Sequence, residues 1–216
     1  LEHWTELKQR SAADSVASEL MAAIRADDRA AAVRLVQAHP GVLHIPLWSG
    51  NWGPPMSHAA NIGRLEIIKA MAALGARDFQ HALDRAVLQG QIECARWLVA
   101  NGAHIEPGVV MGACETLDAD GIRFAAEAKA PFTDEHGDPL APLAMVLETY
   151  GRRPEGKHAI LEIFEQSGYR LPDTPMMAFH RSDLPKLEEH LRGNPSLLEH
   201  RFTLGEIYPT ECGCGR

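Results

Sequence analysis

Residues 54–78 read PPMSHAANIGRLEIIKAMAALGARD, and residues 81–105 read HALDRAVLQGQIECARWLVANGAHI. Each stretch holds two apolar-periodic segments separated by a glycine, Gly63 in the first and Gly90 in the second. The apolar residues after each glycine recur at three- and four-residue spacing, which places them on one face of a helix. Both stretches then reach a second glycine followed by alanine, as expected where a helix ends in the left-handed conformation. The two stretches therefore predict consecutive helix pairs.

The same theme recurs along the chain at a spacing of about 30 residues. We place the turns within the pairs at Asp28, Gly63, Gly90, Asp120, Gly156 and Ser182. Glycines suited to end the second helices are Gly75, Gly102 and Gly168. The expected pairs span residues 12–47, 54–78, 80–105, 107–132, 138–171 and 173–199, within one domain of residues 1–216. One pair cannot bury its own apolar face, whereas stacked pairs bury theirs against neighbours. The pattern predicts an all-α chain of stacked antiparallel helix pairs.

The amino-acid composition argues against two classes of partner, nucleic acids and membranes. The chain has 29 acidic and 21 basic residues, a net charge of −8, and 45% hydrophobic residues. An acidic excess argues against a nucleic-acid partner, because binding to phosphates calls for a basic stripe. No apolar run approaches the ~20 residues that span a membrane, so we expect no membrane partner. These features favour an ordinary globular protein.

The two stretches resemble ankyrin repeats. The pattern is carried in the first stretch by Pro55, Met56, Ala59, Ala60, Gly63, Ile68, Met71, Gly75, Ala76 and Asp78, and in the next by Ala86, Gly90, Leu98, Gly102 and Ala103. The resemblance extends over residues 12–199 and is strongest at 54–105. The chain departs from the family pattern where Ser57 and Asp84 replace the histidine of its T-P-L-H start. A further departure is an insertion, ETYGRRPEG, between the two helices of the fifth pair.

The resemblance implies an α-solenoid with long finger loops, whose concave face and loop tips bind a protein or peptide. Carried over onto this sequence, the concave face comprises His58, Asn61, Ile62, Arg85, Leu88, Gln89 and Glu115, followed by Asp118. Trp48 and Trp52 lie in the loop after the first pair and are candidate contact residues at a loop tip. Two simpler interpretations stay open. The tryptophans can cover the ends of neighbouring helices, and the polar face can be merely solvated.

No constellation of residues indicates catalysis, a cofactor or a metal. The sequence lacks G-x-S-x-G, H-E-x-x-H and a glycine-rich phosphate loop. Cys212 and Cys214 have no second close pair of ligands to complete a zinc site. The acidic run at Asp134 lacks the spacing of a calcium loop, so a solvated turn is the simpler interpretation. Arg152 and Arg153 could contact an anion, although a solvated loop is again simpler.

The sequence thus predicts a non-catalytic protein-interaction module without a cofactor, in the cytoplasm because its cysteines form no disulfide framework. Its oligomeric state is not predicted. The alternative is the ankyrin part of a larger enzyme or effector. NPSLLEHRFTLGEIYPTE, from Asn194, parallels HPGVLHIPLWSGNWGPPM, from His39, which leads into a helix pair. We therefore expect residues 200–216 to form a loop or the start of another repeat, with the chain continuing beyond Arg216.

Overall fold

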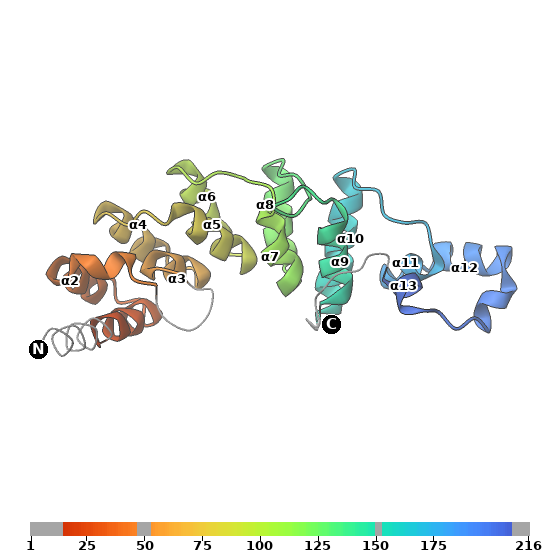
Figure 1. Ribbon diagram of the computed structural model, residues 1–216, viewed down its shortest axis with the longest axis horizontal. Coiled ribbons are helices and arrows are strands. Elements are labelled where there is room, and N and C mark those ends of the chain that lie inside the picture. Colours follow the sequence, from red (N-terminus) through yellow and green to blue (C-terminus); the bar gives the residue numbers. More distant parts are fainter. Residues whose placement is uncertain (1–14, 47–52, 150–152, 209–216) are drawn as a thin grey trace, which may run out of the picture. The chain divides into compact units, whose positions relative to one another are not determined.

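The computed structural model describes residues 15–46, 53–149 and 153–208 (Figure 1). All the regular structure of these residues is helical, and none of them forms a strand, which confirms the all-α prediction. Contacts divide the chain into two compact units, residues 1–104 and residues 105–216. The prediction of a single domain over residues 1–216 stays a prediction.

The first unit consists of three helix pairs. They are a helix over residues 15–25 with α2 (Arg29–Ala38), α3 (Pro55–Asn61) with α4 (Leu65–Ala73), and α5 (Phe79–Leu88) with α6 (Ile92–Ala100). A short 3-10 helix, η1 (Pro40–His44), follows α2. First helices pack on first helices, as α3 does on α5, and second helices on second helices, as α4 does on α2 and α6. This unit is therefore a stack of helix pairs.

The core of the first unit combines large apolar side chains with alanines. Fully buried large residues include Leu20, Ile24, Met56, Ile67, Ile68, Met71, Leu83 and Leu98, and fully buried alanines are Ala59, Ala60, Ala82, Ala86 and Ala95. Alanines at these positions let neighbouring helix backbones approach closely. The side chain of Trp97 is half-buried, and its ring stacks on Phe79 with centroids 6.3 Å apart.

One turn geometry recurs within five pairs. Each turn contains a residue in the left-handed conformation, namely Asp27, Gly63, Gly90, Leu117 and Ser182. The next residue donates its N–H to the carbonyl of an alanine five positions earlier, and these alanines are Ala23, Ala59, Ala86, Ala113 and Ala178. All five alanines are buried. Repetition of both the hydrogen bond and the alanine shows that the pairs are copies of one local structure.

The expected turns at Asp28, Gly63, Gly90 and Ser182 are confirmed, because all four residues lie between the helices of their pairs, and the one at Asp120 is wrong, because Asp120 lies inside α8. Glycine or aspartate was taken as the marker, but leucine occupies the left-handed position in the fourth pair, at Leu117 (φ 55°). A buried alanine four residues before the turn is the better marker. The second-helix ends at Gly75, Gly102 and Gly168 are confirmed, since all three have positive φ.

The second unit also contains three pairs. They are α7 (Val109–Thr116) with α8 (Ala119–Glu127), α9 (Leu140–Glu148) with α10 (Pro154–Gln166), and α11 (Pro175–His180) with α12 (Leu184–Gly193). A 3-10 helix, η2 (Pro195–Leu198), and a short helix, α13 (Leu204–Ile207), follow. Here α7 packs on α9, α8 on α10, and α11 on α13. The rule of first helix on first helix and second on second thus holds for the first two pairs of this unit, whereas the last pair packs on η2 and α13.

Gly156 lies inside α10, so its prediction as a turn is wrong. A Cβ atom at this position would lie 2.3 Å from the backbone oxygen of Leu117. Glycine is therefore required because α10 passes directly over the turn between α7 and α8. Gly156 therefore marks a close approach between two helix pairs, and not a turn within one pair.

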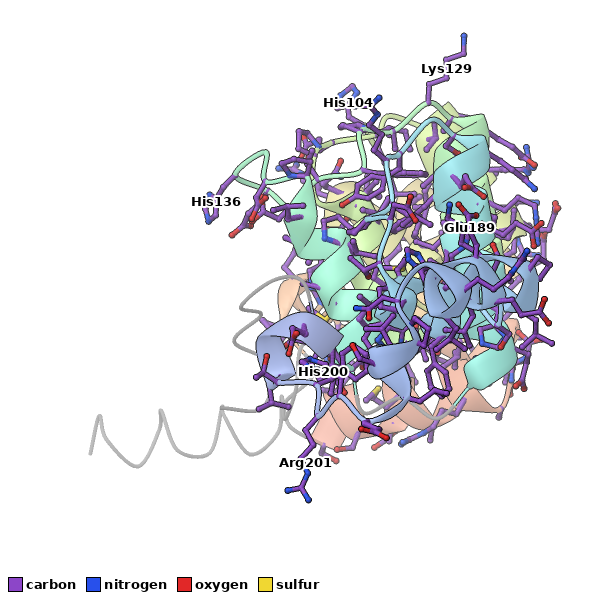
Figure 2. The ribbon with its side chains drawn as sticks, turned by 90° about the vertical axis from the view of Figure 1, so that its right-hand side faces the viewer. His104, Lys129, His136, Glu189, His200 and Arg201 are labelled. Atoms are coloured by element: carbon purple, nitrogen blue, oxygen red, sulfur yellow. The ribbon has the colours of Figure 1, made fainter. Side chains whose placement is uncertain are left out.

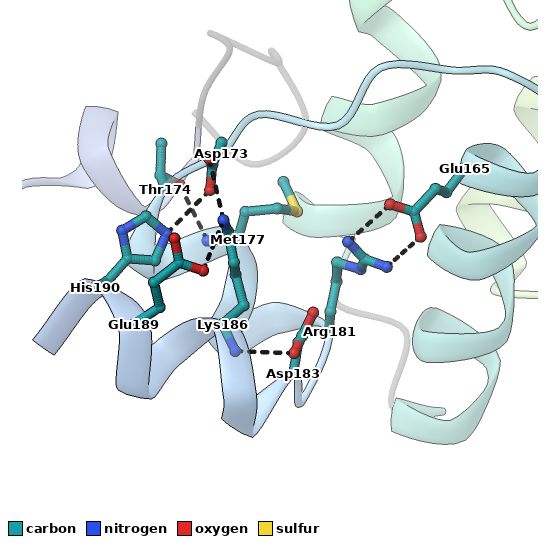
Figure 3. A network of polar contacts seen from close by, with 9 residues as sticks. All are labelled: Glu165, Asp173, Thr174, Met177, Arg181, Asp183, Lys186, Glu189 and His190. Carbon is teal, nitrogen blue, oxygen red and sulfur yellow. Dashed lines mark hydrogen bonds and ion pairs between the residues drawn. The ribbon is translucent and has the colours of Figure 1, made fainter. Parts of the chain in front are cut away.

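The last pair is joined to its surroundings by polar contacts (Figure 3). Arg181 forms a two-pronged ion pair with Glu165 of α10. Asp173 accepts a hydrogen bond from His190 Nε2 at 3.1 Å and lies 3.4 Å from Lys186 Nζ. Most of these side chains are exposed, so solvent screens each contact and its contribution to stability is small. The contacts of Asp173 thus hold the segment before α11 against α12, and the ion pair of Arg181 connects this pair to α10.

Candidate protein-binding surface

The predicted contact residues of α3 and α5 occupy equivalent positions. His58 and Arg85 lie five residues before the left-handed residue of their turns, and Asn61 and Leu88 lie two before it. Residues three apart share a face of a helix. The last turns of α3 and α5, which pack together, therefore form one local surface in the first unit.

Asn61 and Arg85 are in direct contact across this surface. The Oδ1 atom of Asn61 accepts hydrogen bonds from Arg85 Nε at 3.1 Å and from its terminal NH2 group at 2.7 Å. Both side chains are half-buried, so the fork fixes the guanidinium group in place. The sequence predicted both residues at this surface but not the bond between them.

His58 is buried, with 2% of its surface exposed, so its predicted exposure on a binding face is wrong. The reason is the shortness of α3, which packs on both α4 and α5 and buries every residue from Pro55 to Ala60. Burial, with the charges of Arg25 and Arg85, lowers the pKa of His58 to about 4. The imidazole is therefore neutral at pH 7 and adds no charge to the surface.

Arg25 belongs to this surface and was missed. It lies two residues before Asp27, as Asn61 lies two before Gly63, and its charge acts on His58. Its side chain is exposed, and its backbone oxygen accepts a hydrogen bond from Arg64 at 2.9 Å. Counting back two residues from each turn would have found it. The surface therefore carries two guanidinium groups around a neutral histidine.

The other predicted residues are placed as follows. Ile62 and Leu88 are half-buried, and Gln89 is exposed, all next to the turns of their pairs. Glu115 is an exposed residue of α7 in the second unit, and its backbone oxygen accepts a hydrogen bond from Thr149. Trp48 and Trp52 lie outside the described residues.

At the other end of α3, Ser57 and Asp78 form a structural link. Asp78 Oδ2 accepts hydrogen bonds from the backbone N–H of Ser57 at 3.0 Å and from its hydroxyl at 2.5 Å. The N–H belongs to the first turn of α3, where helical partners are lacking. The carboxylate from one pair therefore caps the helix of the preceding pair. Ser57, at the position of the ankyrin-pattern histidine, fastens adjacent pairs.

The remaining candidate sites acquire structural explanations. Asp134 Oδ1 accepts the backbone N–H groups of His136 and Asp138, so the acidic run is a hydrogen-bonded turn. Arg153 lies 4.0 Å from Asp118, within the second unit. Among the described residues, no group of three or more His, Cys, Asp or Glu side chains could hold a metal ion. Cys212 and Cys214 lie outside that part of the chain.

Two cysteine thiols are unsuited to nucleophilic chemistry. Cys94 and Cys114 are both buried and free. Burial raises the pKa of Cys94 to about 11, and it also raises the pKa of Cys114. Because the thiolate is the reactive form, both side chains act as small apolar core residues.

Comparison of the sequence with protein-family models and with curated proteins gives no match. Within residues 15–46, 53–149 and 153–208, no helix is both long and apolar enough to cross a membrane.

Proposed function

We propose that the chain is a non-catalytic protein-interaction module, an ankyrin-like stack that binds a protein or peptide partner through its first-helix surfaces and loop tips. The observation that carries this proposal is the contrast between two positions within the repeated pair. Alanine recurs four residues before the turn in five pairs. The residue two before the turn differs each time, being Arg25, Asn61, Leu88, Glu115 and His180.

We assign the two positions different roles: the position four residues before the turn maintains the framework, and the position two residues before it serves recognition. An invariant buried alanine maintains the packing of each pair, while side chains of varied chemistry are displayed at a neighbouring position on the same helix. Repeat proteins bind partners through such variable positions on a constant framework. The fork between Asn61 and Arg85 pre-organises one of these displayed cations, which lowers the entropy lost on binding. The surface therefore favours a polar partner segment.

Affinity capture with matched arginine variants tests the proposal. Immobilised full chain is compared with Arg85→Ala, on first helix α5, and with Arg96→Ala, on the exposed side of second helix α6. We expect partner proteins retained by the wild type to be lost with Arg85→Ala and kept with Arg96→Ala. Retained proteins should also protect the α3–α5 surface from amide hydrogen exchange.

Two outcomes contradict the proposal in different ways. If the folded wild type retains no protein above the level of a heat-unfolded sample, the chain is not an interaction module. If both variants retain the partner equally and exchange protection lies elsewhere, the α3–α5 surface is not the binding surface. Circular dichroism of both variants verifies that the helices are intact.

A further inference from the structure

The second unit contains a pocket of about 420 Å³ between the start of α11, η2 and α13. It is separate from the α3–α5 surface. Its lining residues are Thr174, Pro175, Met176, Met177, Asn194, Ser196, Leu197, His200, Phe202, Gly205, Glu206 and Ile207. This volume lies in the range of ligand pockets, which are mostly apolar with a few placed polar groups. Three helices and the loop that contains His200 and Phe202 thus converge on one cavity.

The pocket is an open groove. Of its lining residues, only Met177 is buried, while Met176, Leu197 and Phe202 are half-buried and the polar members are largely exposed. Leu198 and Leu204, next to lining residues, are 77% and 67% exposed. An apolar groove open along its length suits a chain that lies across it better than a small enclosed molecule.

The wall formed by α13 is held in a defined position. Thr203 and Glu206 form a reciprocal capping box at the start of this helix. His180 Nε2 lies 3.0 Å from the backbone oxygen of Ile207, which ties α13 to α11. His200 Nε2 lies 2.9 Å from Glu206 Oε1, and its ring meets Phe202 edge-on with centroids 4.7 Å apart. The groove therefore has a pre-formed shape.

The charge at the groove is negative. Among the residues that the structure describes, Glu206 and His200 are the ionisable side chains that line it. Hydrogen bonds from the backbone N–H of Thr203, from His200 and from the Thr203 hydroxyl lower the pKa of Glu206 to about 2. Arg201, which separates His200 from Phe202 in the sequence, extends away from the ribbon (Figure 2). A cationic group next to the groove therefore meets a permanent carboxylate.

One hydrogen-bond donor at the rim is available. Asn194 Oδ1 accepts the hydroxyl of Ser196 at 2.7 Å, which orients the amide. The amide nitrogen of Asn194 has no hydrogen-bond partner among the described residues. An amide nitrogen at the edge of an apolar groove can donate to the carbonyl oxygen of a peptide backbone.

We propose that this groove binds an extended peptide segment in which a large apolar residue is adjacent to a basic one. The apolar side chain lies against Met176, Leu197 and Phe202. The basic side chain lies near Glu206, and Asn194 donates to the peptide backbone. The commitment to a basic partner rests on charge complementarity, since Glu206 lines the groove and none of the described lining residues is a lysine or arginine.

The test uses three probes: acetyl-Leu-Lys-Gly-amide, acetyl-Leu-Glu-Gly-amide and hexylamine. Each is titrated into the ¹⁵N-labelled full chain while the backbone amide signals of residues 194–207 are followed. We expect saturable shifts with the lysine peptide, binding at least three-fold weaker with the glutamate peptide, and weaker binding still with hexylamine. Absence of saturable shifts with the lysine peptide overturns the proposal, and equal affinity for hexylamine overturns the peptide as occupant.

Adjacent residues supply matched controls. Leu197→Ser should weaken lysine-peptide binding at least three-fold, whereas Leu198→Ser, which alters an exposed residue outside the lining, should not. Glu206→Gln should abolish the preference for lysine over glutamate, and Glu199→Gln should leave it intact. Equal effects within either pair of variants overturn the proposed site.

Glu206 also caps α13, so a second variant keeps the charge test interpretable. His200→Gln removes the imidazole that contacts the Glu206 carboxylate but leaves Thr203 and Glu206 in place. The preference for the lysine peptide should then increase, because no imidazole competes for Glu206. An unchanged or reduced preference overturns the role of this carboxylate.

Discussion

The pairs α5–α6 and α11–α12 have the same turn but differ greatly in burial. In both, the residue after the left-handed position donates to a buried alanine, from Gln91 to Ala86 at 2.8 Å and from Asp183 to Ala178 at 2.9 Å. Yet α5 and α6 contain seven buried residues between them, whereas α11 and α12 contain two, both on α11. Local hydrogen bonding therefore sets the form of a pair, and its neighbours determine how much apolar surface the pair buries.

The neighbours of the two pairs account for the difference. Helix α5 packs along α3, and α6 packs against α4. The extensive contacts of α11 and α12, within the described residues, are with each other, η2 and α13. Leu184, on the apolar face of α12, consequently remains 66% exposed, whereas Leu98, on the apolar face of α6, is fully buried. Helical periodicity predicts which face is apolar but not whether that face is covered.

The largest expected effect is that of truncating one apolar leucine in the second helix of each pair. Leu98→Ala removes a fully buried side chain and should reduce the free energy of unfolding by ~2–5 kcal/mol. Leu184→Ala removes a largely exposed one and should change it by less than ~0.5 kcal/mol. Urea unfolding followed by circular dichroism measures both. Similar losses for the two variants would show that α12 is covered in solution.

A pH titration probes the interior of the packed pairs at His58. Its pKa is about 4 in the folded chain against 6.5 in the unfolded chain, so the unfolded chain binds the proton more readily between these values. Stability should therefore fall as pH decreases from about 6.5 to 4, by at most about 3 kcal/mol from this residue. Urea unfolding of wild type and His58→Gln at pH 7, 5.5 and 4.5 measures this contribution.

His136 provides the matched control for that titration, because its side chain is 80% exposed. His136→Gln should retain the pH dependence of the wild type, and His58→Gln should weaken it. If the three proteins lose stability in parallel on acidification, the buried imidazole is not responsible.

A smaller effect distinguishes two helical glycines. Gly156→Ala places a Cβ against the backbone of Leu117 and should destabilise the second unit by ~1–3 kcal/mol. Gly193→Ala, at the end of α12, meets no atom within 4 Å and should stabilise it by ~0.4–1 kcal/mol. Melting temperatures of the two variants should therefore move in opposite directions. A shift of the same sign would mean that α10 does not pass close to Leu117.

Much of the fold could be predicted from the sequence because each pair encodes itself locally. The three-residue spacing of apolar residues fixed the helices, and Gly63, Gly90, Gly75 and Gly102 marked the turns. Prediction failed where one backbone conformation accepts several residue types. Leu117 takes the left-handed position without any of the residues that usually signal it. The prediction at Gly156 failed for the opposite reason. In the sequence, a glycine required by packing against a distant segment cannot be distinguished from a glycine required by a turn.

The candidate surface was harder to predict. The resemblance to ankyrin repeats predicted Asn61 and Arg85 on one face, and their side chains are hydrogen-bonded to each other. It could not show that His58 is buried, because the burial of α3 arises from contacts on several sides at once. The groove beside α13 depends on residues 174–207 coming together from four segments, and no local pattern announces such a cavity.

The repeated turn has a consequence for how such a chain can change length. Gly63, Gly90 and Leu117 are spaced 27 residues apart, and each begins the same hydrogen-bonded geometry over a buried alanine. A segment bounded by two of these turns begins and ends at the same backbone conformation. When such a segment is removed, the two remaining ends of the chain can be joined in that same conformation. Duplication or loss of 27 codons at this phase would thus be tolerated more readily than the deletion of a single residue inside a helix. The helix pair is therefore the unit in which we expect this sequence to gain or lose length.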